Sequence, residues 1–91
     1  MKRYLVETYL ARGATAERAE HDRRARSAAE ELTRESTRVS FDRSIHVPDD
    51  EICFFVFDAP SSRDAALVAE RAGLDPVRIV EATSSQEEED S

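Results

Sequence analysis

Residues 69–81 read AERAGLDPVRIVE, a stretch that closes one helix and opens the strand after it. Gly73 suits the left-handed conformation that often follows a helix, because glycine has no Cβ to clash there. Leu74 supplies the apolar contact that accompanies such an end, and Pro76 prevents the helix from continuing. The sequence therefore predicts a helix that ends before Gly73 and a final strand over residues 77–83.

The start of this helix is also marked in the sequence. Ser61 follows Pro60 and is the expected N-cap, since its hydroxyl can accept a hydrogen bond from a free backbone N–H of the first turn. Asp64, three residues later, gives an aspartate version of the capping box. Apolar residues then recur at helical spacing and form the predicted buried stripe: Ala65, Val68, Ala69 and Ala72.

The N-terminal part of the chain predicts a strand followed by a long helix. Residues 3–10 are rich in aromatic and β-branched residues, which is typical of a strand, and Gly13 ends it. Thr15 is the expected cap of the helix, which runs to about Glu35 and has Glu17 in its first turn. Residues at spacings of three and four share its inner face: Ala14, Arg18, His21, Ala25, Ala28 and Leu32.

The middle of the chain predicts a hairpin. Residues 38–47 alternate in character: Val39, Phe41, Ile45 and Val47 lie on one side, with Arg43 as the single exception, and Ser40, Asp42, Ser44 and His46 lie on the other. Pro48 takes the favoured second position of a turn. The returning strand, residues 51–58, is apolar on both sides, which indicates a central strand covered on both faces: Ile52, Phe54 and Val56 on one side, Cys53, Phe55 and Phe57 on the other.

The order strand-helix-strand-strand-helix-strand predicts an α+β, ferredoxin-like fold in a single domain over residues 1–83. We expect a four-stranded antiparallel sheet of order 4-1-3-2 with both helices on one face. The second apolar face of the third strand then needs another cover. The simplest cover is the sheet of a second molecule, which predicts a homodimer, a dimeric α+β barrel, with the side that carries Phe55 as one candidate for the intermolecular face.

Charge and composition exclude several classes of function. The chain of 91 residues has a formal net charge of −7, and residues 84–91 form an acidic tail that we expect to be disordered. Arginines of the first helix alternate with carboxylates, which argues against a nucleic acid partner. No apolar run approaches the ~20 residues that span a bilayer and no signal peptide is evident, so we expect a cytoplasmic protein without membrane contact. The two glycines are too few for a loop that binds a nucleotide cofactor, and the single cysteine, Cys53, is expected to be buried.

Three segments together carry a likeness to a known family. RYLVE at residues 3–7, FDAPS at residues 57–61 and AERAGLDPVRIVE at residues 69–81 resemble a family of small bacterial ferredoxin-like proteins that includes a nickel-binding member. The resemblance implies a dimeric ferredoxin-like fold. It also implies Ni²⁺ or another divalent metal as the leading candidate ligand, held in the nickel-binding member by histidines.

His21 and His46 are the two histidines of the chain and therefore the candidate metal ligands. If the apolar side of residues 38–47 faces the helices, His46 faces away from them while His21 faces the sheet. A metal site would then need His46 from both subunits, with about one metal per dimer. The alternative is that His21 is a partly buried core residue and that His46 is simply exposed.

Glu7 interrupts an apolar strand that we expect to be central, so its carboxylate should be partly desolvated and suited to act as a general base. Glu81 in the neighbouring strand is expected to share a proton or a cation with it. The alternative is that Glu7 pairs with an arginine such as Arg43. If the protein is an enzyme, Glu7 and His46 are the candidate catalytic residues.

A small ligand pocket is the remaining candidate site. Its predicted lining is Tyr9, Phe41, Phe55, Phe57 and Glu81, although core packing can account for the phenylalanines. The sequence thus favours a small dimeric ligand-binding protein, with a metal as the leading ligand. One alternative is a cofactor-free enzyme of a biosynthetic pathway that acts on a small organic substrate within the dimeric barrel. Another is a non-catalytic small-molecule or protein-interaction module.

Overall fold

The computed structural model describes residues 1–83 and residue 85 of the chain. Its elements follow one another as β1 (Lys2–Tyr9), α1 (Thr15–Arg34), β2 (Ser40–Val47), a 3₁₀ turn (Pro48–Asp50), β3 (Ile52–Ala59), α2 (Ser62–Arg71) and β4 (Pro76–Ala82). The predicted element order is confirmed, with strand boundaries shifted by at most two residues. Most of the expected acidic tail lies outside the described residues.

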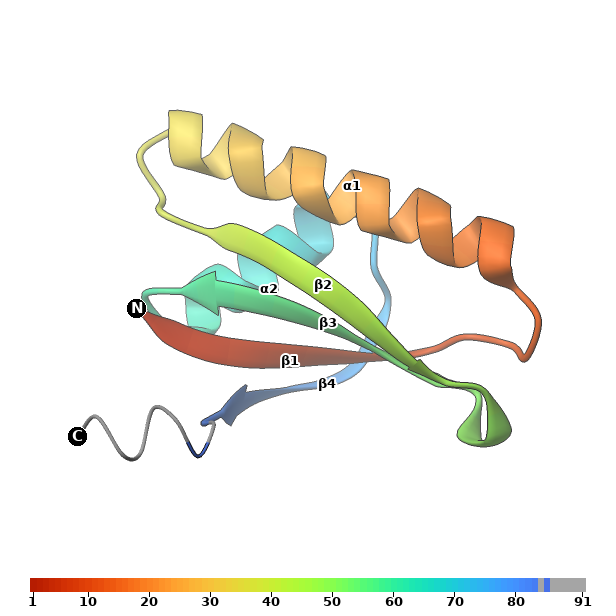
Figure 1. Ribbon diagram of the computed structural model, residues 1–91. Coiled ribbons are helices and arrows are strands. Elements are labelled where there is room, and N and C mark those ends of the chain that lie inside the picture. The colour runs from red at the N-terminus through yellow and green to blue at the C-terminus, as the bar shows by residue number, and fades with distance from the viewer. Residues whose placement is uncertain (84, 86–91) are drawn as a thin grey trace.

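The four strands form one antiparallel sheet in the order β2-β3-β1-β4, which is the predicted order read from the other edge. Both helices lie on the same side of this sheet (Figure 1). The chain therefore has the predicted ferredoxin-like fold, with one sheet face under the helices. The other face, on which no described helix lies, is called the open face below.

The core lies between the sheet and the helices. Alternate side chains of β1 and β3 point into it, and Phe55 and Phe57 are fully buried there. The inner face of α1 is built from small residues, which lets the helix approach the sheet closely: Ala25, Ala28 and Ala29, followed by Leu32. Phe55 therefore faces the helices, and the side of β3 that the helices leave uncovered is the one that carries Phe54.

The two helices begin in different ways. At α2 the predicted cap is confirmed: the backbone N–H of Asp64 donates to Ser61 Oγ at 3.2 Å. At α1 the predicted cap is wrong, because Ala14 takes the N-cap position and Thr15 is already the first helical residue. The start lies one residue earlier than predicted, after Gly13 with its positive φ of 83°, and the N-cap makes no side-chain hydrogen bond there.

A β-bulge changes the faces of β2. Phe41 pairs with Phe57 and Arg43 pairs with Val56, so Asp42 is an extra residue that has no partner of its own. Beyond the bulge the alternation shifts by one residue. The predicted sides are therefore wrong there: Ser44 and His46 lie on the helix-covered face, and Ile45 and Val47 lie on the open face.

Side chains of α1 contact the outer edge of β2 and the residue before it. The Thr33 hydroxyl donates to the Val39 carbonyl at 2.8 Å and accepts from its N–H at 3.3 Å. Arg18 donates to the Ser44 carbonyl and to Ser44 Oγ, each at 3.0 Å. These contacts satisfy backbone groups that an edge strand otherwise leaves to solvent.

Candidate functional site

The open face is arranged in rows that run across the strands. In two of these rows apolar side chains predominate: Val80, Leu5 and Val56 with Arg43, and Tyr9, Ile52 and Val47. A third row joins an ion pair to an apolar half: Arg78, Glu7, Phe54 and Ile45. Ile45 is 43% exposed and Tyr9 is 66% exposed, so this face presents apolar surface to solvent.

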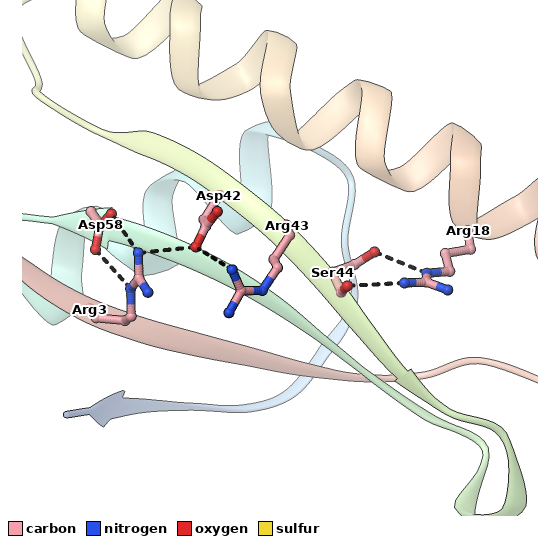
Figure 2. Close-up of polar contacts among 6 residues, drawn as sticks. All are labelled: Arg3, Arg18, Asp42, Arg43, Ser44 and Asp58. Atoms are coloured by element: carbon pink, nitrogen blue, oxygen red, sulfur yellow. Dashed lines mark hydrogen bonds and ion pairs between the residues drawn. The ribbon is translucent and has the colours of Figure 1, made fainter. Parts of the chain in front are cut away.

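A charged network closes one end of the open face (Figure 2). Arg3 on β1 makes a two-point contact with Asp58 on β3, from Nε at 3.1 Å and from Nη2 at 3.2 Å. Arg3 Nη2 also lies 3.1 Å from the carboxylate of Asp42, and Arg43 Nη1 lies 3.4 Å from the same carboxylate. The network thus joins three strands, and the bulge at Asp42 allows its carboxylate to reach Arg3.

Glu7 lies in the middle of the open face. Arg78 Nε donates to Glu7 Oε1 at 3.0 Å, while the Glu7 side chain is only 16% exposed. The predicted alternative of an arginine partner is therefore correct in kind, with Arg78 in place of Arg43. The expected pairing with Glu81 is wrong: Glu81 stands opposite Tyr4 in the register, on the other side of the sheet, and lies 3.8 Å from Lys2.

The open face is electrically balanced although the chain is acidic. Its three arginines and three carboxylates give no net charge: Arg3, Arg43 and Arg78, against Glu7, Asp42 and Asp58. The whole chain has a formal net charge of −7. The excess negative charge therefore belongs to residues other than these six.

Both histidines lie on the helix-covered side, which corrects the expectation that they face opposite ways. His46 Nε2 is 3.2 Å from the Leu10 carbonyl oxygen. The His21 ring stands edge-on to Phe55 at 6.0 Å between centroids. Burial lowers the pKa of His21, and the nearby Arg24 charge lowers it further.

The positions of the histidines argue against two expected sites, a metal site built from two copies of His46 and a catalytic pair of Glu7 and His46. Two copies of His46 do not meet across the open face, since His46 points away from it. Glu7 and His46 also lie on opposite sides of the sheet, so one substrate does not contact both within one chain. Within residues 1–83 and 85, no group of three or more His, Cys, Asp or Glu side chains is placed to hold a metal ion.

The residues predicted to line one pocket lie in two different places. Phe41, Phe55 and Phe57 are buried in the core, where the Phe41 ring contacts the other two, and Tyr9 lies on the open face. Cys53 is buried as expected, and burial raises the pKa of its thiol. Sequence reasoning missed the network of Arg3, Asp42, Arg43 and Asp58, although Arg43 at an otherwise apolar position was a signal of the bulge.

Comparisons with known proteins support the fold and nothing finer. No family model matches the chain, and no curated protein is significantly similar to it. Among solved structures, SCO4226 from Streptomyces coelicolor A3(2) has a similar fold, with a TM-score of 0.68 and 22% sequence identity. The likeness covers 91% of this chain and 98% of that one. Among the described residues, no helix is both long and apolar enough to cross a membrane.

Proposed function

We propose that this protein is a homodimer whose two open faces pack together and bind a small organic ligand between them. The observation that carries the proposal is the apolar surface of the open face, which the chain's own helices leave uncovered. Ile45 and Tyr9 are exposed on this face, and Phe54 between them is partly buried with no helix above it. Apolar surface of this kind marks an interaction site when it is contiguous.

The dimensions and the charge of the open face suit a second copy of the chain. Three strands of eight residues and one of seven give a face of about 27 Å by about 19 Å, or roughly 500 Å² per partner. Two such faces bury roughly 1,000 Å² together, which is at the lower limit for a specific interface. The charge balance of this face means that two acidic molecules meet there without local repulsion.

The ion pair of Glu7 and Arg78 argues for a ligand with both polar and apolar parts. Packing a second sheet over this pair would remove it from water, which is unfavourable unless further hydrogen bonds are formed. A ligand with a polar group beside Glu7 and Arg78 and an apolar body against Phe54 would supply those bonds. Each subunit would contribute one such pair, so the site would be complete only in the dimer.

Metal binding through His21 and His46 stays a prediction, and titration calorimetry with Ni²⁺ and Zn²⁺ tests it. Because both histidines lie on the helix-covered side, a metal bound there would not need the dimer. We expect His46→Ala to weaken such binding. Nickel affinity that is unchanged when both histidines are replaced by alanine would exclude the metal reading and leave the ligand site of the open face.

The dimer itself is tested by a matched pair of substitutions. Ile45 on the open face is 43% exposed, and Leu67 on the outer side of α2 is 37% exposed. Ile45→Glu should dissociate the dimer, since it places two carboxylates in the interface, and Leu67→Glu should leave it intact. Light scattering at micromolar concentration measures the result. A wild-type monomer, or equal effects of the two substitutions, would contradict the proposal.

A further inference from the structure

The two helices form a pocket on the side of the sheet away from the open face. Its volume is about 230 Å³, and its walls are α1 and the end of α2. Three arginines and one serine belong to its lining: Arg23, Arg24, Arg71 and Ser27. Glu31 is the one carboxylate that the described part of the chain adds to this lining.

Arg24 differs from the other two arginines because it forms no ion pair within residues 1–83 and 85. Its Nε is buried and has no hydrogen-bond partner in the part of the chain that the structure describes. By contrast, Arg71 donates to Glu31 at 3.1 Å and to Glu35 at 3.0 Å, and Arg23 pairs with Glu20. A buried N–H donor that is left unpaired is unfavourable unless an acceptor binds there.

The end of α2 explains why Arg24 is held in this position. A Cβ on Gly73 would lie 3.4 Å from Arg24 Nη1 and 3.7 Å from its Cζ, so the guanidinium packs against the turn after the helix. The negative end of the α2 dipole partly compensates the Arg24 charge there. This compensation gives Arg24 Nε no hydrogen-bond acceptor in the described structure. The side chain as a whole is only partly buried and lines the pocket, so a ligand there can reach the guanidinium.

We propose that this pocket binds a small anion that carries a phosphate group, with Arg24 as its main contact. The planar fork of N–H groups on arginine matches the geometry of phosphate oxygens. Arg23, Arg71 and the Ser27 hydroxyl would complete the site. A volume of about 230 Å³ is below the ~300–1,000 Å³ of sites for larger ligands, so the anion is inorganic phosphate or a short phosphate monoester.

His21 provides a readout of this site within the same helix. It lies three residues before Arg24, and the Arg24 charge is one of the causes that lower its pKa, after burial. Glu17 and Asp22 on α1 act in the opposite direction, and the sheet presents the uncharged ring of Phe55. An anion bound to Arg24 would offset the guanidinium charge, so the pKa of His21 would rise on binding.

An NMR titration of the full chain with inorganic phosphate at constant ionic strength tests the proposal. The same titration with glycerol 3-phosphate distinguishes free phosphate from a monoester. We expect saturable binding in the wild type, with a rise in the pKa of His21. Arg24→Gln should weaken binding at least about tenfold, because a charge-assisted hydrogen bond is lost. Arg63→Gln is the control, since Arg63 is an exposed arginine at the start of α2 and should bind as the wild type does.

Arg24→Lys keeps the positive charge and removes the planar fork of N–H groups. It replaces Arg24→Gln in the test if that variant does not fold. It should bind phosphate more weakly than the wild type and still show a lowered pKa at His21. Absence of saturable binding with both probes in the wild type would overturn the proposal. Equal losses in the Arg24 and Arg63 variants would also overturn it, because they would indicate general charge screening. The open face is remote from this pocket, so neither result depends on dimer formation.

Discussion

The two faces of the sheet differ in how their apolar residues are covered, and the neighbours Phe54 and Phe55 show the difference. Phe55 is fully buried under the helices, whereas Phe54 points to the open face and is only partly buried. The covered face is complete within one chain. The open face has similar apolar residues, and it lacks a cover in the described structure. One strand thus serves both the folding of the monomer and, in our proposal, the association of two monomers.

The largest expected effect comes from the covered face. Phe55→Ala removes a fully buried ring and leaves a cavity, which should lower the free energy of unfolding by about 3–5 kcal/mol. Denaturant unfolding measures this change. A loss below that of Phe54→Ala under conditions where both variants are monomeric would show that the two faces have been assigned in reverse.

Substitutions on the open face should weaken dimer association more than they lower the free energy of unfolding. We expect Phe54→Ala to raise the dimer dissociation constant by about tenfold or more, because central aromatic residues dominate interface energy. Sedimentation equilibrium over a range of concentrations gives this constant. The isolated subunit should remain folded, as judged by its circular dichroism. An unchanged dissociation constant would remove Phe54 from the interface.

Within the helix layer, α2 is stabilised at its start by the Ser61 cap. Ser61→Ala should lower the free energy of unfolding by about 1 kcal/mol, since the Asp64 N–H loses its acceptor. Thr15→Ala is the matched control and should have a much smaller effect, because Thr15 is not an N-cap. Thermal unfolding of both variants checks the comparison. Similar losses in the two would mean that Thr15 supports α1 by another contact.

The smallest expected effect is a pH dependence of the free energy of unfolding, which comes from His21 on the covered face. The pKa of His21 is lowered from 6.5 in the folded state, so the unfolded chain binds more protons between the two values. Stability from His21 is therefore fully present above about pH 6.5 and is lost as the pH falls through that value toward the folded pKa. His21→Gln should flatten this slope in denaturant unfolding at pH 5.5 to 7.5, and Tyr9→Ala on the open face should not.

The sequence predicted the elements well because each has a local signal. The αL exit at Gly73, the Ser61 cap and the doubly apolar β3 all depend on neighbours within a few residues. The faces of β2 were predicted wrongly because one extra residue, Asp42, reverses every position after it. Arg43 marked the break in the pattern. From the sequence alone, Arg43 could be an isolated polar residue on an apolar side or the sign of a bulge. The bulge places the Asp42 carboxylate beside Arg3, which lies in another strand and cannot be paired with it from the sequence.

The charged parts of the candidate sites were the least predictable, because they depend on contacts between distant residues. Glu7 was recognised from its position in an apolar strand, and its partner Arg78 is known only from the pairing of β1 with β4. Arg24 was one of several arginines that alternate with carboxylates on the first helix. In the described structure Arg24 Nε has no hydrogen-bond partner, and the guanidinium contacts the turn at Gly73, which no helical pattern indicates.

The contacts of Thr33 and Arg18 with the β2 edge affect which assemblies this chain can form. A foreign strand that approaches this edge finds the backbone groups of Val39 and the Ser44 carbonyl already bonded, and the bulge at Asp42 interrupts the spacing that it would need. Sheets that add strands edge to edge continue without limit, as in fibrils. In our proposal, contact through the open face instead closes after two copies. The bonded backbone groups and the bulge thus hinder strand addition along β2 and, in our proposal, favour a closed dimer over an open-ended assembly.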